Sequence, residues 1–137
     1  MPQTKDLVNH FRDMIVANQV FIDAGIDKGR VYRQFVSGVK NPGPVYPCIT
    51  IITDSDPEPA WRIKEVSVWF TVHTAEFRQT EQLTEALELM FHEYKGTSTT
   101  PELVIYQTLS QGNYKVPLYD EKTNKWMATL LFKSRIG

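Results

Sequence analysis

Cys48 and His73 are the residues whose types best suit nucleophilic chemistry, because an imidazole base can activate a thiol as the thiolate. Cys48 opens the run Cys-Ile-Thr-Ile-Ile-Thr, whose β-branched residues are typical of a strand. A thiol at the start of such a run is more often a small buried side chain than a nucleophile. We therefore favour a structural role for Cys48 and predict no catalytic residue.

Carboxylates and histidines offer a second kind of chemistry, acid–base catalysis or metal binding. The candidates are Glu81, Glu85 and Glu88 on one predicted helix face, and the pairs Glu88–His92 and Asp6–His10. Each pair could supply two metal ligands, but nothing in the sequence supplies a third, so hydrogen-bonding pairs are favoured. A row of glutamates more often forms a solvated helix face or a face that meets a partner. We therefore expect no metal, no cofactor and no enzymatic activity.

Apolar side chains on otherwise polar faces give a different signal, because aromatic residues are enriched at protein contact surfaces. Leu89 falls nearly opposite the apolar stripe of its predicted helix, and Trp69 falls on the polar face of its predicted strand. An isolated exposed leucine is also common, and cover by the first helix would equally explain the tryptophans. Our candidate residues for a subunit or partner interface are Trp61, Trp69, His73, Glu85, Leu89 and Glu93.

The stretch from Arg62 to Lys95 must position most of these candidates. Its first part alternates with a period of two, which predicts a half-buried strand over 62–74. The side chains that point one way are Val66, Val68, Phe70 and Val72. A helical stripe then follows, made of Leu83, Ala86, Leu87, Met90, Phe91 and Tyr94. Thr80 is predicted to cap this helix at its start, and Gly96 to end it.

The rest of the chain supplies a first helix and further strands. We predict a helix over 5–22, a short strand over 30–36, a Pro- and Gly-containing loop over 37–47, and a strand over 48–53 that pairs antiparallel with 62–74. A loop over 97–101, a strand over 103–109, an irregular edge over 114–119, a hairpin turn over 120–125 and a final strand over 126–133 follow. The final strand is partly apolar on both faces, which suits a central or doubly covered strand. The pattern predicts one α+β domain, residues 1–137, with two helices on a mostly antiparallel, mixed-order sheet in the order α-β-β-α-β-β.

Composition narrows the class of protein. The chain has 137 residues, 42% of them hydrophobic and 23% charged, which is ordinary for one globular domain. It begins without a signal-like segment and has no apolar run long enough to span a membrane, so no membrane partner is expected. A single cysteine excludes an internal disulfide and fits a reducing compartment.

Charge is nearly balanced overall but unevenly spread. The net charge is −1, which argues against tight nucleic-acid binding. Residues 54–102 carry ten acidic and four basic side chains, whereas residues 103–137 carry five basic and two acidic ones. Such a split could make copies of the chain complementary to one another, although charges also gather wherever surface is exposed.

Three motifs in order resemble the tail-completion, or tail-terminator, proteins of long-tailed bacteriophages. Arg30-Val31-Tyr32, a proline-containing gap and Pro47-Cys48-Ile49-Thr50-Ile51 resemble the family's entry into its sheet. The strand 62–72 with the helix segment 81–91, and then the hairpin Tyr119 to Trp126 with its apolar strand, resemble the elements that follow. The resemblance lies in their order and spacing and covers nearly the whole chain.

The resemblance implies a structural virion protein that is assembled in the host cytoplasm and located in the tail or neck. Such proteins form a ring, usually of six copies, on the head-proximal end of the tail tube. They end tube polymerisation and present the surface that joins the head. The implied partners are further copies of the chain, the tail-tube protein and a head-closure connector, with DNA only as cargo passing through the lumen. Two alternatives stay open, a head-closure or other neck subunit and a cytosolic ligand-binding or enzymatic α+β domain.

Overall fold

The computed structural model describes residues 4–40, 43–54, 63–99, 102–112 and 116–137. These residues form an α+β fold in which helices pack on a mixed sheet, as predicted from the sequence. The helices are α1 (Thr4–Ala17), α2 (Gln19–Asp23) and α3 (Phe77–Phe91), with single 3₁₀ turns at Lys28–Arg30 and Val36–Gly38. The strands are β1 (Val31–Tyr32), β2 (Cys48–Thr53), β3 (Lys64–Thr74), β4 (Gly96–Thr99), β5 (Glu102–Ser110), β6 (Leu118–Asp120) and β7 (Lys125–Ile136).

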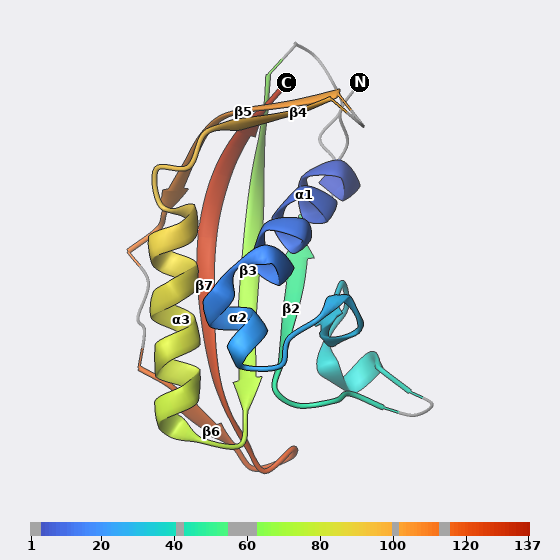
Figure 1. The fold of residues 1–137 in the computed structure, drawn as a ribbon, viewed down its shortest axis with the longest axis vertical. Coiled ribbons are helices and arrows are strands. Elements are labelled where there is room, and N and C mark those ends of the chain that lie inside the picture. Colours follow the sequence, from blue (N-terminus) through green and yellow to red (C-terminus); the bar gives the residue numbers. More distant parts are fainter. Residues whose placement is uncertain (1–3, 41–42, 55–62, 100–101, 113–115) are drawn as a thin grey trace.

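The sheet is organised around β3 and β7, which run antiparallel along their whole length (Figure 1). The strand order is β1-β2-β3-β7-β5-β4, and only the pair β1–β2 is parallel. The edge of β7 that faces away from β3 pairs with two strands. The strand β6 pairs with the first residues of β7, and β5 pairs with its last residues. The predicted antiparallel pairing of 48–53 with 62–74 is confirmed, with Cys48 opposite His73 and Thr53 opposite Val68.

The core lies between the helices and one face of the sheet. Val66, Val68, Phe70 and Val72 are fully buried there, as their spacing predicted. At the centre the ring of Phe70 stacks on that of Phe91 with centroids 5.0 Å apart, and Phe11 and Phe132 pack around them. Offset and edge-on aromatic contacts of this kind add to the free energy of burying the rings. This cluster ties α1 and α3 to the two central strands.

The first helix is interrupted, contrary to the prediction of one helix over 5–22. The backbone of Asn18 is extended, and its side-chain oxygen accepts a hydrogen bond from the N–H of Val20 at 3.0 Å. Asparagine competes with the helical backbone in this way and favours caps. The chain therefore ends α1 at Ala17 and starts α2 at Gln19.

Both predicted ends of the second long helix are wrong. Helix α3 begins at Phe77, and the Thr80 hydroxyl instead bonds to the hydroxyl of Thr74, which ties the end of β3 to the start of the helix. The helix ends at Phe91, after which Glu93 takes a left-handed φ of 64° and donates its N–H to the carbonyl of Thr108 at 2.7 Å. Glycine at position 96 has another role, because it leaves room for the Tyr94 side chain, which lies where a Cβ would stand.

Three strand predictions also need correction. Residues 96–99 form β4 rather than a loop, paired with β5, and the predicted strand over 30–36 shrinks to Val31–Tyr32. The final strand runs on to Ile136. Of its two predicted placements, the central one is confirmed, because β7 lies between β3 and β5, whereas the helices cover only one of its faces. On that face Leu130 and Phe132 are buried, whereas Met127 and Leu131 on the other face are half-buried.

Candidate interaction surfaces

Cys48 and His73 come together in the structure, because they are directly opposite each other on β2 and β3. The Cys48 side chain is fully buried, and His73 is 6% exposed. Burial raises the pKa of the Cys48 thiol to about 12, an effect that the Arg30 charge only partly offsets. Burial also lowers the pKa of His73 to about 4, against the opposing influence of Asp120.

These pKa values leave both groups neutral at pH 7. A thiolate beside an imidazolium would need the opposite shifts, a low thiol pKa and a high imidazole pKa. The Nδ1 atom of His73 is buried without a hydrogen-bond partner, and the ring lies edge-on to Tyr46 with centroids 6.4 Å apart. The geometry therefore favours a packed thiol and imidazole, which is the structural role that the sequence indicated for Cys48.

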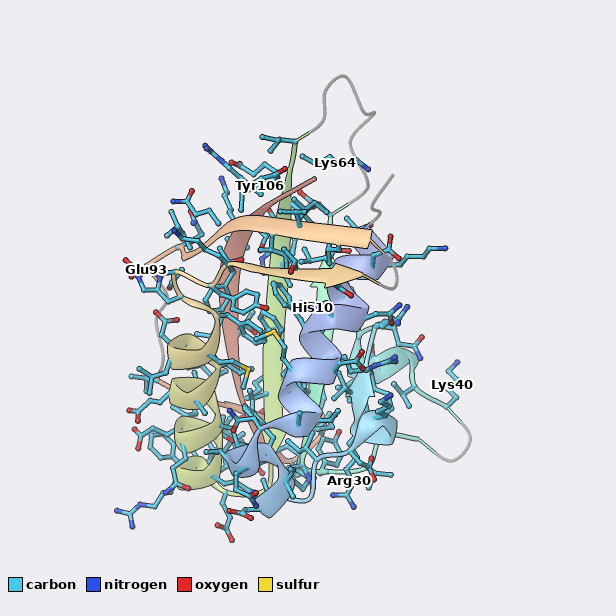
Figure 2. All side chains as sticks on the ribbon, turned by 45° about the horizontal axis from the view of Figure 1, so that its top comes forward. His10, Arg30, Lys40, Lys64, Glu93 and Tyr106 are labelled. Carbon is cyan, nitrogen blue, oxygen red and sulfur yellow. The ribbon has the colours of Figure 1, made fainter. Side chains whose placement is uncertain are left out.

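The other histidines form hydrogen bonds within the fold. The Nε2 atom of His10 on α1 (Figure 2) lies 2.8 Å from the hydroxyl of Tyr94, and this pair links α1 to the segment after α3. The Nδ1 atom of His92 accepts the backbone N–H of Ser110 at 3.1 Å. Among the residues that the structure describes, no three His, Cys, Asp or Glu side chains are grouped as metal ligands.

One face of the sheet is left uncovered by the helices, all of which lie on the opposite face in the described part of the chain (Figure 1). We call it the open face. It is formed by the outward residues Thr50 and Ile52 of β2, Glu65, Ser67, Trp69, Thr71 and His73 of β3, and Met127, Thr129, Leu131, Lys133 and Arg135 of β7. Trp69 is half-buried there, and the hydroxyls of Thr71 and Thr129 are 3.0 Å apart across the strands.

The open face is hollowed at the end where β3 finishes. The hollow has a volume of about 420 Å³. Its lining is Phe35, Val36, Thr50, Ile52, Trp69, Thr71, His73, Met127 and Thr129. The outer wall is formed by the 3₁₀ turn that begins at Val36 and by Phe35, which is 70% exposed. The hollow is therefore an apolar depression with a threonine pair in its floor.

The other end of the open face is charged. Glu65 lies between Lys133 and Arg135, with nitrogen–oxygen distances of 3.9 Å and 3.7 Å. All three side chains are about half exposed, so each ion pair adds little to stability. Asp54 lies at the same end and accepts the backbone N–H of Ser67, the neighbour of Lys133 across the strands, so this end of the open face carries both signs of charge.

The outer face of α3 carries the second candidate surface. Leu89 is 85% exposed, the highest exposure of any large hydrophobic side chain among the described residues. Glu81, Gln82 and Glu85 are exposed along the same side, and Glu93 follows just beyond the helix (Figure 2). The predicted position of Leu89 opposite the core is confirmed, and Leu87 on the inner side is fully buried.

The candidate residues thus separate into two surfaces. Trp69 and His73 belong to the open face, and Glu85, Leu89 and Glu93 belong to the outer side of α3. Trp61 lies outside the described residues. His73 contributes little surface because it is nearly buried. The hollow itself was missed, because its wall comes from 35–36, in the segment predicted as a strand.

Comparison with protein-family models, with curated proteins and with solved structures found no significant match. None of the described helices is long and apolar enough to cross a membrane.

Proposed function

We propose that this chain is a ring-forming structural protein at the head-proximal end of a phage tail tube, where it ends tube polymerisation and joins the tail to the head. The observation that carries the proposal is the open face of the sheet, whose half-buried centre includes Trp69, Ile52 and Met127. Aromatic and methionine side chains are enriched in protein contact surfaces. A subunit that assembles needs such a surface in addition to its own core.

Two of the three motifs behind the sequence resemblance support the proposal, because the entry segment and the closing hairpin meet at one end of the sheet. Tyr32 accepts the backbone N–H of Val45 on its hydroxyl at 3.0 Å, which fixes the loop that leads into β2. From the closing hairpin, the amine of Lys125 lies 4.9 Å from the centre of the Tyr46 ring. The entry segment and the closing hairpin, which are far apart in the sequence, therefore contact each other in the fold.

The proposal names the same partners as the resemblance. Further copies of the chain form the ring, six being the usual number in that family, and the ring contacts the tail-tube protein on one side and a head-closure connector on the other. DNA passes through the lumen as cargo. The location is the virion tail or neck, and the role is structural rather than enzymatic.

Deleting the gene tests the proposal. Particles made without the chain should have abnormally long tails, or tails that do not join heads, and supplying the wild-type chain should restore normal virions. Tails of normal length that join heads in its absence would reject the proposal. A cryo-EM map of the neck would separate a tail terminator from a head-closure subunit by position.

The hollow favours a second candidate, a small-ligand-binding domain. Its volume of about 420 Å³ falls within the usual range for ligand pockets, and its lining is mostly apolar with a few polar groups. This alternative predicts a monomer or dimer whose thermal unfolding temperature rises when one metabolite of a screen is added. A tight metabolite together with normal tails in the deletion would favour it over the ring.

A further inference from the structure

We infer that Leu89 of one copy seats in the hollow of the open face of the next copy, so that the ring is built from a head-to-tail contact between α3 and the sheet. The inference rests on the proposed function, because it identifies the two surfaces through which the ring would form. The occupant of the hollow is then a second copy of this chain.

The two surfaces match in polarity, because each offers apolar side chains to water. Leu89 is 85% exposed on a side of α3 that is otherwise polar, so it does not belong to the core of its own subunit. The hollow offers Ile52, Trp69 and Met127 as half-buried apolar neighbours. Seating the leucine would remove apolar surface of both copies from water, which is the main driving force of protein association.

The side of α3 that carries Leu89 is acidic, and the open face carries two basic side chains beyond the hollow. Glu81, Glu85 and Glu93 lie on the Leu89 side, whereas Lys133 and Arg135 lie beside Glu65 at the charged end of the open face. Complementary charge of this kind orients partners and suppresses wrong pairings. It also gives the uneven spread of charge along the sequence a role in assembly.

The spacings of the charges agree as well. Glu81 precedes Leu89 by two helical turns, or roughly 12 Å along the helix axis. Lys133 follows Thr129, in the floor of the hollow, by four strand residues, or roughly 13 Å along the strand. With Leu89 over Thr129 and α3 antiparallel to β7, Glu81 therefore lies level with Lys133 along the strand, about a quarter turn of helix round from Leu89.

The two surfaces cannot meet within one subunit. The helix α3 packs on the covered face of the sheet (Figure 1), whereas the residues that line the hollow belong to the other face. A contact between two different surfaces is heterologous, and it generates a ring when the rotation between copies closes. This contact would therefore make each copy both a donor of Leu89 and an acceptor of the next copy's Leu89.

Cysteine cross-linking tests the pairing directly. The variants Leu89→Cys and Thr129→Cys are purified separately, mixed in equal amounts and oxidised mildly, with the buried Cys48 left in place. We expect a disulfide-linked dimer in the mixture and in neither variant alone, and a ladder of linked copies when one chain carries both changes. The control Ala17→Cys, on the exposed side of α1, should not link to Thr129→Cys.

Several outcomes would overturn the inference. No Leu89–Thr129 disulfide, a Leu89→Cys variant that links to itself, or a monomer whose hollow instead binds a small apolar probe would each reject the head-to-tail contact. A charge swap gives a second readout, because Glu81→Lys and Lys133→Glu should each weaken self-association and together restore it.

The same experiments separate the inference from the proposed function. A ring seen on tails without the Leu89–Thr129 disulfide would reject this contact and retain the function. The disulfide in a protein whose deletion leaves tails normal would retain the contact and reject the function.

Discussion

Cys48 and His73 lie directly opposite each other on neighbouring antiparallel strands, and both side chains are buried at the end of the sheet where the loop from Tyr46 enters. Neighbouring thiol and imidazole groups suggest a catalytic pair, but burial shifts both pKa values toward the neutral forms. The environment of a pair therefore decides its chemistry more than its proximity does.

The first prediction concerns the reactivity of Cys48. Because burial raises the pKa of this thiol to about 12, almost none is thiolate at pH 8. A disulfide reagent should modify the native protein at least about 100-fold more slowly than the urea-unfolded chain, since the thiolate is the reactive form and the native thiol is also inaccessible. Reaction of the native protein at the rate of an exposed thiol would contradict this account of the pair.

The second prediction concerns stability against pH. The folded state lowers the pKa of His73 from 6.5 to about 4, so the unfolded chain binds more protons between these values. The contribution of His73 to the free energy of unfolding is therefore fully present above pH 6.5 and is lost as pH falls toward 4. The total loss is about 3 kcal/mol, at 1.36 kcal/mol per unit of pKa shift. Urea unfolding at several pH values measures it.

The variant His73→Phe isolates this effect. Its stability should fall less steeply than that of wild type between pH 6.5 and 4, because the titrating group is gone while His10, whose pKa burial also lowers, remains in both proteins. Parallel curves for the two proteins would show that His73 is not the group responsible.

The third prediction compares two leucines on opposite sides of α3. Leu87 is fully buried, so Leu87→Ala should cost about 2–5 kcal/mol of unfolding free energy. Leu89 is 85% exposed, so Leu89→Asp should cost less than about 1 kcal/mol while self-association is lost. Chemical denaturation and analytical ultracentrifugation give the two readouts. A Leu89→Asp monomer that unfolds as readily as Leu87→Ala would place Leu89 in the core.

The fourth prediction compares two neighbours on β3 that face opposite ways. Phe70 is fully buried, and Phe70→Ala should cost about 3–5 kcal/mol. Trp69 is half-buried on the open face, and Trp69→Ala should keep a cooperative fold with a smaller loss, about 1–2 kcal/mol, while weakening assembly. Loss of folded structure in Trp69→Ala by circular dichroism would instead mean that the open face is part of the core.

Sequence periodicity correctly predicted which side chains of β3 and α3 face the core. The alternation over β3 and the stripe of α3 correctly separated Phe70 and Leu87 from Trp69 and Leu89, because each period allows one buried face. The boundaries of the elements were predicted less well, because local hydrogen bonds and strand pairing compete with the periodic pattern there. Asn18 caps a new helix, and the polar Gly-Thr-Ser-Thr segment becomes β4 because it pairs with the edge of β5.

The candidate surfaces were predictable to different degrees. Leu89 and Trp69 could be placed outward from spacing alone. The hollow could not, because it needs Phe35 and Val36 beside β2 and β3, a tertiary contact between segments that no local pattern encodes. The run Phe35-Val36 before Gly38 was the available signal, but an alternating strand explained it equally well.

Capping of tail tubes tests the central claim most directly. Purified chain is added to tail-tube subunits of the same virion as they polymerise, and tube lengths are measured by negative-stain electron microscopy. Short tubes with a ring at one end are expected with wild type and with the control Val20→Asp on exposed α2, and long uncapped tubes with Leu89→Asp. Tubes that grow to the same length with and without the wild-type chain would contradict its role as a tail terminator.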